Sequence, residues 1–225
     1  MIRFLFLATL VFFSISLQAQ PPKGVKPDYY LIKKLIENRK SVSFYPKLLK
    51  RLQEKDTTLT KDDFHNLYYG YSLQKDYNPY SRNANEEELG EYLSKESLTP
   101  SEQVEFIRLA NKLLNQDPFN FQVMHALAQV YEMNGNMPMA KKVSFLLNNF
   151  ISAIISTGDG LSCETGFHVI TINHEYLILS VFDVESQMQS LIDNCDYLSF
   201  EKGRYKIDGL YFDISKMMES MLGKN

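Results

Sequence analysis

The chain has 225 residues, of which 44% are hydrophobic and 23% are charged, values typical of a folded globular protein and unlike those of a disordered one. Its formal net charge is -3, and no block of Lys and Arg is present. Nucleic-acid-binding proteins usually carry a basic stripe, so this composition argues against that class. The length suits one domain or two small ones.

Residues 1–19 have the pattern of a secretory signal peptide. Arg3 supplies a positive start, residues 4–15 form an apolar run, and Ala19 is a small residue at the expected cut site. The run is shorter than the roughly 20 apolar residues that a membrane-spanning helix needs. We therefore expect a periplasmic or extracellular protein with a linker over residues 20–26 and no stable membrane insertion after cleavage.

Residues 27–156 show apolar side chains at helical spacing and predict a stack of helices. Two helix starts are marked by N-capping residues. Thr60 precedes a first turn rich in aspartate, and the segment from Thr99 to Glu102 is a capping box with Pro100 at the first helical position. A short acidic helix is predicted over residues 83–93.

Five tyrosines lie close together between residues 68 and 80, around a predicted turn. One interpretation is an aromatic platform for a sugar ring or a peptide, to which Tyr69, Tyr77 and Tyr80 would contribute exposed rings. The other is a helix face that packs in the core, since aromatic stripes at helical spacing are usually buried.

The segment around residues 118–147 resembles a tetratricopeptide repeat. The residues at the repeat's small and large positions are Leu127, Ala128, Tyr131, Gly135 and Ala140. The pattern departs from the repeat at Met124 and Ser144, where larger side chains are usual. About three repeats are needed for a concave binding array, so one good repeat indicates a short helical hairpin.

Residues 157–225 read as the strand-forming part of an α+β protein. We predict strands over residues 167–171, 176–182, 196–200, 205–207 and 210–214, with a turn at 173–174 and a short helix or loop over 184–192. A last amphipathic helix follows Ser215. The expected arrangement is a small antiparallel sheet that packs on the helices as one folding unit.

The residues that could carry chemistry gather after residue 157. Cys163 and Cys195 could be two buried reduced thiols, a disulfide, which an oxidising compartment permits, or the source of one reactive nucleophile, which would need a nearby histidine. The sequence leaves these alternatives open. A hydrolase would use Cys163 or Ser162 with His168, but the second glycine of G-x-S-x-G is missing. His174 and Glu175 lack the second histidine of H-E-x-x-H, so we expect no metal and no cofactor.

Two blocks, LYYGYSLQKDYNPY at 67–80 and GDGLSCETGFHVITINHEYLIL at 158–179, together with the leader, resemble an uncharacterised family of secreted Gram-negative bacterial proteins, domain of unknown function 4919. The resemblance implies that nearly all of the mature chain is one folding unit. It implies no activity and no catalytic residues.

From these observations we expect an exported, non-enzymatic interaction module for a protein or a glycan. The residues expected to contribute to its binding surface are Tyr69, Tyr77, Tyr80, Asp159 and His168. The alternatives are the hydrolase-like enzyme described above and a structural envelope protein that associates with itself.

Overall fold

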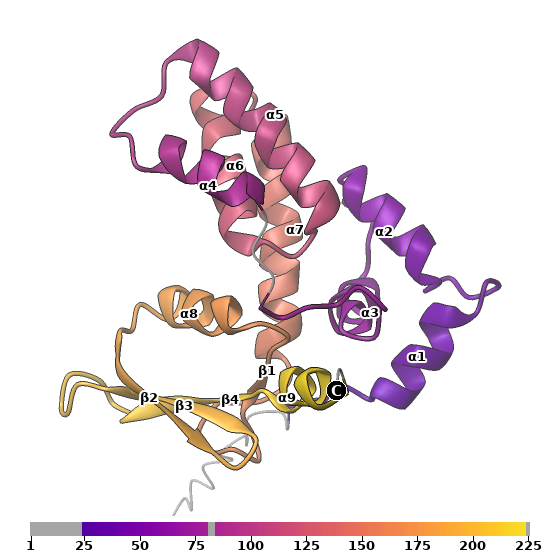
Figure 1. The fold of residues 1–225 in the computed structure, drawn as a ribbon, viewed down its shortest axis with the longest axis vertical. Coiled ribbons are helices and arrows are strands. Elements are labelled where there is room, and N and C mark those ends of the chain that lie inside the picture. The colour runs from indigo at the N-terminus through magenta and orange to yellow at the C-terminus, as the bar shows by residue number, and fades with distance from the viewer. Residues whose placement is uncertain (1–23, 81–83, 224–225) are drawn as a thin grey trace, which may run out of the picture.

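The computed structural model describes residues 24–80 and 84–223, and it shows an α+β protein with a helical N-terminal part and a small sheet (Figure 1). The predicted signal peptide and residues 20–23 of the linker lie outside the described residues. Within the two described ranges, no helix combines the length and the apolar character needed to cross a bilayer.

Seven helices precede the first strand in the described residues. They are α1 (Tyr29–Glu37), α2 (Tyr45–Gln53), α3 (Lys61–Tyr71), α4 (Ala84–Leu93), α5 (Pro100–Gln116), α6 (Phe121–Met133) and α7 (Met137–Ile155). Helices α5, α6 and α7 stack on one another, whereas α1 and α2 pack on α3 (Figure 1). Helix α7 contacts both α3 and the first strand, so it joins the stack to the sheet.

The two predicted capping residues begin helices as expected. The Thr60 side chain accepts a hydrogen bond from the Asp63 N–H, and the Asp63 carboxylate accepts one from the Thr60 N–H. Thr99 and Glu102 form the same reciprocal pair at the start of α5. Each pair satisfies two backbone donors that a helix N-terminus otherwise leaves free.

The sheet has four strands in the order β1-β4-β3-β2. Their bounds are β1 (Phe167–His168), β2 (Ser186–Ile192), β3 (Cys195–Phe200) and β4 (Gly209–Asp213). The pairs β2–β3 and β3–β4 are antiparallel, but β1 runs parallel to β4. The sheet is therefore mixed, and the expectation of a wholly antiparallel sheet is wrong for its first strand.

Four predictions of local structure in the second half are also wrong. The turn predicted at residues 173–174 and most of the strand predicted at 176–182 lie in helix α8 (Ile172–Val181). Residues 184–192 contain strand β2, and residues 205–207 form no strand. The apolar run in α8 is almost continuous in the sequence and continues onto its exposed face at Tyr176 and Val181, so it lacks the periodicity that separates helix from strand. Strand β2 is exposed and largely polar, so its sequence lacks the alternation of apolar and polar residues that indicates a strand. Helix α9 (Ser215–Leu222) agrees with the prediction.

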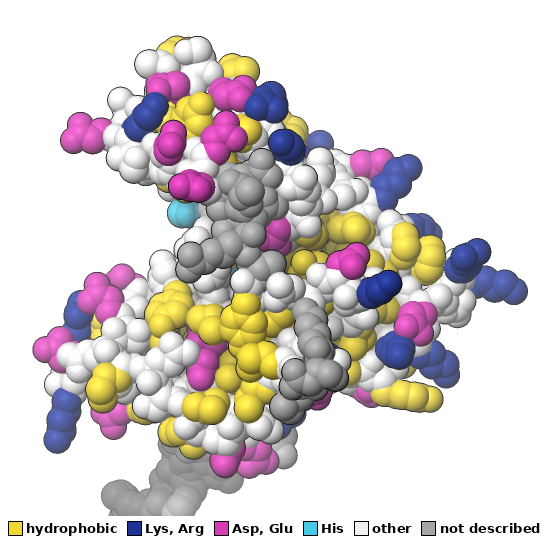
Figure 2. All heavy atoms as spheres, viewed as in Figure 1, with side chains coloured by type: hydrophobic (Ala, Val, Ile, Leu, Met, Phe, Trp, Pro, Cys, Tyr) yellow, Lys and Arg dark blue, Asp and Glu magenta, His cyan; other side chains and the backbone are white. Residues whose placement is uncertain are grey.

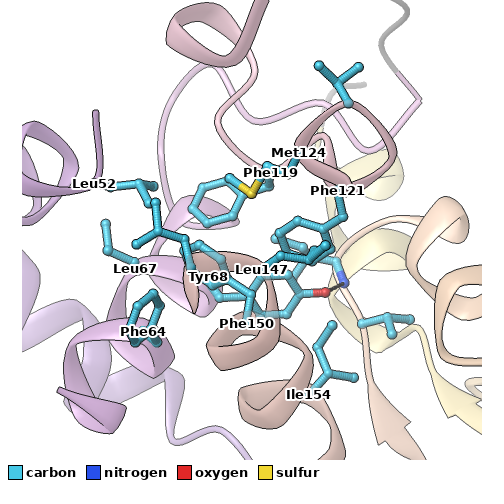
Figure 3. Close-up of a cluster of buried hydrophobic side chains, with 14 of the residues drawn as sticks. Leu52, Phe64, Leu67, Tyr68, Phe119, Phe121, Met124, Leu147, Phe150 and Ile154 are labelled. Carbon is cyan, nitrogen blue, oxygen red and sulfur yellow. Dashed lines mark hydrogen bonds between the residues drawn. The ribbon is translucent and has the colours of Figure 1, made fainter. Parts of the chain in front are cut away.

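The core centres on aromatic rings that several helices contribute (Figure 3). Phe150 on α7 is fully buried, and its ring centroid lies 4.9 Å from that of Phe64 on α3. It lies 5.3 Å from Phe119 and 5.4 Å from Phe121, which enter from the α5–α6 connection and from α6. One side chain thus packs against α3 and against the stretch of residues 119–121 that begins α6.

We expect Phe150→Ala to lower the free energy of unfolding by about 3–5 kcal/mol, because it removes a buried ring and leaves a cavity. Urea unfolding followed by circular dichroism measures this change. The control is Val104→Ala on the exposed side of α5, where 61% of the residue is accessible and the cost should stay within about 0.5 kcal/mol. Equal costs for the two variants would contradict the assignment of Phe150 to the core.

Candidate functional site

The tyrosine block of α3 faces inward, toward the chain that connects β1 to α8. Tyr69 is fully buried and Tyr77 is 4% exposed, so the expectation that they contribute to a binding surface is wrong. The Tyr69 hydroxyl donates to the His168 carbonyl at 3.0 Å, and the Tyr77 hydroxyl donates to the Ile170 carbonyl at 2.6 Å. Their hydroxyls satisfy backbone carbonyls that burial would otherwise leave without partners.

Tyr68 joins the same connection through a buried histidine. Its hydroxyl accepts from the Ile170 N–H at 3.3 Å and lies 2.8 Å from His174 Nδ1. Because the single hydroxyl proton then points to Nδ1, the histidine carries its own proton on Nε2, which lies 2.9 Å from the Phe119 carbonyl. Burial lowers the pKa of His174 to about 4, so the ring is neutral at physiological pH.

The remaining three predicted surface residues occupy different environments. Tyr80 is 47% exposed, in agreement with the expectation. Asp159 is exposed, but its Oδ1 accepts from Thr165 Oγ1 at 2.6 Å and from the Leu161 N–H at 2.9 Å, which lowers its pKa. His168 is largely buried, with Nδ1 3.6 Å from Asp213 Oδ1, and burial lowers its pKa. Of these three side chains, His168 is therefore the one that the structure turns away from the surface.

The residues of the hydrolase hypothesis, Cys163, Ser162 and His168, each bond to other partners. Cys163 and Cys195 form a disulfide with a Cα–Cα distance of 5.7 Å, so neither sulfur is a thiol nucleophile. The Ser162 hydroxyl lies 2.9 Å from the Thr165 hydroxyl within the loop that follows Gly160. Since His168 faces Asp213, this structure assembles no Cys–His pair.

The structure instead brings together two carboxyl groups that the sequence did not single out as a pair. Glu175 on α8 is 0% exposed, and the group that faces its buried carboxyl is the side chain of Asp196. Asp196 on β3 is 6% exposed, and burial together with this neighbour raises the pKa of Glu175 to about 9. Glu175 is therefore protonated at neutral pH.

Polar and aromatic side chains surround this pair. Gln189 on β2 donates from Nε2 to Asp196 Oδ2 at 2.7 Å, and its Oε1 accepts from the Tyr176 hydroxyl at 3.0 Å. Burial, and after it the nearby carboxyl groups of Asp196 and Glu175, raise the pKa of Tyr80. Tyr80 and Tyr176 are each about half exposed. We call these five residues the carboxyl-pair site.

One sequence signal could have revealed the site. Glu175 directly precedes the apolar run at residues 176–179, and Asp196 precedes the predicted strand residues 197–200. A charged residue in a buried segment is unusual, because burying an unpaired charge is costly. Their proximity could not be inferred, since the prediction placed residues 176–182 in a strand and residues 184–192, which contain β2, in a short helix or loop.

A second surface feature lies beside this site. Strand β2 forms one edge of the sheet, and all its residues after Ser186 are exposed. Its sequence, SQMQSLI, contains no charged residue and no proline. Edge strands present unpaired backbone groups, and proteins usually protect them with charges, prolines or bulges. The register shifts between Ser186 and Met188, but the pairing from Met188 to Ile192 is regular.

We expect Tyr77→Phe to lower the free energy of unfolding by about 1–3 kcal/mol, because it leaves the buried Ile170 carbonyl without its donor. The matched control is Tyr80→Phe, which removes a hydroxyl from a half-exposed ring and should cost much less. Chemical denaturation of the three proteins measures the difference. A Tyr77→Phe variant as stable as wild type would show that the hydroxyl does not hold the two parts together.

We expect Glu175 to make the protein less stable as the pH rises from 7 to 9. The folded state keeps a proton that the unfolded chain releases above its ordinary pKa of 4.5, so this stabilisation is lost as the pH approaches 9. His174 has the opposite effect on stability. Because burial lowers its pKa to about 4, the unfolded chain takes up a proton below its ordinary pKa of 6.5 that the folded state does not, so stability falls as the pH drops from 6.5 towards 4.

Glu175→Gln carries no titrating group at this position and should escape the effect. The unfolding free energies of wild type and Glu175→Gln, measured by urea denaturation at each pH, should diverge by roughly 1.4 kcal/mol per pH unit at most. Parallel pH profiles for the two proteins would mean that Glu175 is ionised in the folded state.

Comparison with known proteins places the chain in a family without adding an activity. No curated protein and no solved structure matches the sequence. The family model described as "Domain of unknown function (DUF4919)" matches residues 30–222. This range takes in α3 with its tyrosines, the segment that these tyrosines hold, and the carboxyl-pair site. The match covers most of the chain, which therefore belongs to the family of domain of unknown function DUF4919.

Proposed function

We propose that this protein is an exported, non-enzymatic interaction module that binds an extended segment of a partner protein along strand β2. The observation that carries the proposal is the exposed, uncharged edge of β2. An extended peptide can add to such an edge through main-chain hydrogen bonds, and side-chain pockets beside it then provide specificity.

The side chains of β2 suit this role. Met188 is 67% exposed and Leu191 is 59% exposed. They point to opposite faces of the sheet because they are three positions apart on one strand, and their partners on β3 are Ser199 and Asp196. A partner strand would cover apolar surface on both faces as well as the backbone edge. Figure 2 shows hydrophobic side chains gathered over the sheet half of the molecule, whereas charged side chains dominate the far end of the helical stack.

Two observations support export. The first 19 residues have the signal-peptide pattern described above, although they lie outside the described residues. The disulfide between Cys163 and Cys195 ties the loop after Gly160 to the start of β3. Disulfides persist in oxidising compartments such as the periplasm and the extracellular space.

We also infer that α6 and α7 are the tetratricopeptide-like hairpin. Gly135 lies in the turn between them with φ of 78°, a conformation that glycine adopts without strain. Ala128 and Ala140 are buried, and their small side chains suit close packing of the two helices. In this proposal the hairpin is a scaffold that positions the sheet, because a single repeat does not build a binding array.

A photo-crosslinking residue at Ser190 tests the proposal in cells, with the same residue at Val104 on α5 as the control. We expect Ser190 to crosslink to one extended segment of one protein, identified by mass spectrometry of the joined peptides. The purified partner should then lose at least about tenfold in affinity for Leu191→Lys and keep its affinity for Val104→Lys, since a lysine on the edge blocks strand addition.

Each of the other outcomes would overturn the proposal in its present form. Crosslinks from Ser190 to a second copy of the chain would identify a self-associating protein. Equal crosslinking at Ser190 and Val104, or unchanged affinity of Leu191→Lys, would show that β2 is not the contact.

A glycan is the second candidate ligand, supported by one aromatic pair. Tyr197 on β3 and Tyr211 on β4 are register partners, and their ring centroids lie 4.5 Å apart. Both residues are partly exposed. Neighbouring tyrosines of this kind can stack on a sugar ring. Binding on a glycan array that Tyr211→Leu removes and Leu191→Lys leaves intact would favour this candidate over the protein partner.

A further inference from the structure

A small cavity lies where the end of α2 meets the helices α5, α6 and α7 (Figure 1). Its volume is about 30 Å³, which is room for roughly two water-sized groups. Among the described residues that line it, Lys55 carries the only charge. Most of the other lining side chains are apolar: Leu52, Leu114, Pro118, Met124, Val143 and Leu146. A cavity of this composition suits a ligand that has both an apolar part and a negative charge.

Lys55 holds a backbone conformation that lysine rarely adopts. Its φ is 56°, in the left-handed region, and it follows directly on the last residue of the α2 cap. The Lys55 N–H donates to the Leu52 carbonyl and the Asp56 N–H to the Arg51 carbonyl, a pair of bonds that usually has glycine at the position of Lys55. Residues in strained conformations cluster at functional sites, so this lysine calls for a functional explanation.

The Lys55 ammonium has a second ammonium nearby and no acidic partner. Its Nζ donates to Asn111 Oδ1 on α5 at 2.7 Å. Burial, and after it the charge of Lys142 on α7, lower the pKa of Lys55. Within residues 24–80 and 84–223, neither lysine forms an ion pair with a carboxylate. Since Lys142 directly precedes Val143 of the lining, two positive charges without a counter-ion lie beside an apolar cavity.

We propose that this cavity binds a small carboxylate with a short aliphatic group, for which propionate is the model. In the complex the carboxylate bonds to Lys55 Nζ and is attracted by Lys142, while the aliphatic carbons fill the apolar space. We call this site the Lys55 cavity. It lies in the helical part, away from β2 (Figure 1), so it does not depend on the proposed function.

The donors and the lining favour a carboxylate over an inorganic anion. Asn111 already donates from Nδ2 to the Ile107 carbonyl at 2.6 Å and to the Tyr131 hydroxyl at 3.1 Å, so the donors for a ligand are chiefly the lysines. A carboxylate has a single charge and two acceptor oxygens, which two ammonium groups satisfy. Phosphate or sulfate has no apolar part and would leave oxygens against the apolar lining, which is costly.

A titration with propionate at constant pH and ionic strength tests the site, with propionamide as the uncharged control of equal size. The protein is purified from cells that express the whole chain. The readout is the methyl resonance of Met124, which lines the cavity and is assigned by its absence in Met124→Leu. We expect saturable shifts at millimolar propionate and none with propionamide. Acetate, which is one methylene shorter, should bind about fourfold more weakly if that group is buried.

The variants separate a binding role of Lys55 from a structural one. Lys55→Gly removes the ammonium and suits the left-handed backbone, so it should weaken propionate binding about tenfold or more and unfold at a urea concentration no lower than wild type. Lys55→Met keeps the length of the side chain and should lose the same affinity. The matched control is Lys141→Gln, which removes a charge from an exposed position on α7 and should bind as wild type does.

Two results would overturn the Lys55 cavity as a binding site. The first is equal shifts with propionate and propionamide, which would show that charge plays no part. The second is unchanged propionate affinity in Lys55→Gly and Lys55→Met, and a loss of stability in these variants would then assign the lysine a purely structural role. Neither result bears on crosslinking from Ser190, so this inference and the β2 proposal can fail independently.

Discussion

The fold depends on hydrogen bonds between the tyrosine hydroxyls of one segment and the backbone of another. Tyr69 and Tyr77 donate to carbonyls at residues 168 and 170, and Tyr68 accepts from the Ile170 N–H while bonding to His174. The connection from β1 to α8 is buried here and too irregular to satisfy its own backbone groups. The helical part supplies the missing hydrogen-bond partners, so the connection from β1 to α8 is stable only when it is packed on the helices.

This dependence explains why the two most distinctive blocks of the sequence occur together. The block at residues 67–80 supplies the tyrosines, and the block at residues 158–179 supplies the backbone groups and the histidine that they bond. The same contact places α8 over the sheet (Figure 1), which brings Glu175 to Asp196. The structural contact and the carboxyl-pair site are thus two sides of one helix, with His174 facing the core and the next residue facing β3.

The proposed binding surface uses the opposite end of the sheet from this anchor. Strand β1 is held by the helices and pairs with β4, whereas β2 forms the free edge. A rigid core on one side and an unpaired edge on the other is an arrangement that lets a partner strand add without rearranging the fold.

The sequence by itself determined the features that depend on neighbouring residues. Thr60 and Thr99 predicted their helix starts because a capping side chain bonds to a backbone N–H only three residues away. The α+β class followed from helical spacing before residue 156 and from β-branched segments after it. Tertiary structure alone decided whether the apolar run at 176–182 was helix or strand, since apolar residues on every side carry no period. It also decided that Tyr69 and Tyr77 point inward and that Glu175 meets Asp196, because those contacts join residues that are 20 to 100 positions apart, and no local pattern encodes such a distance.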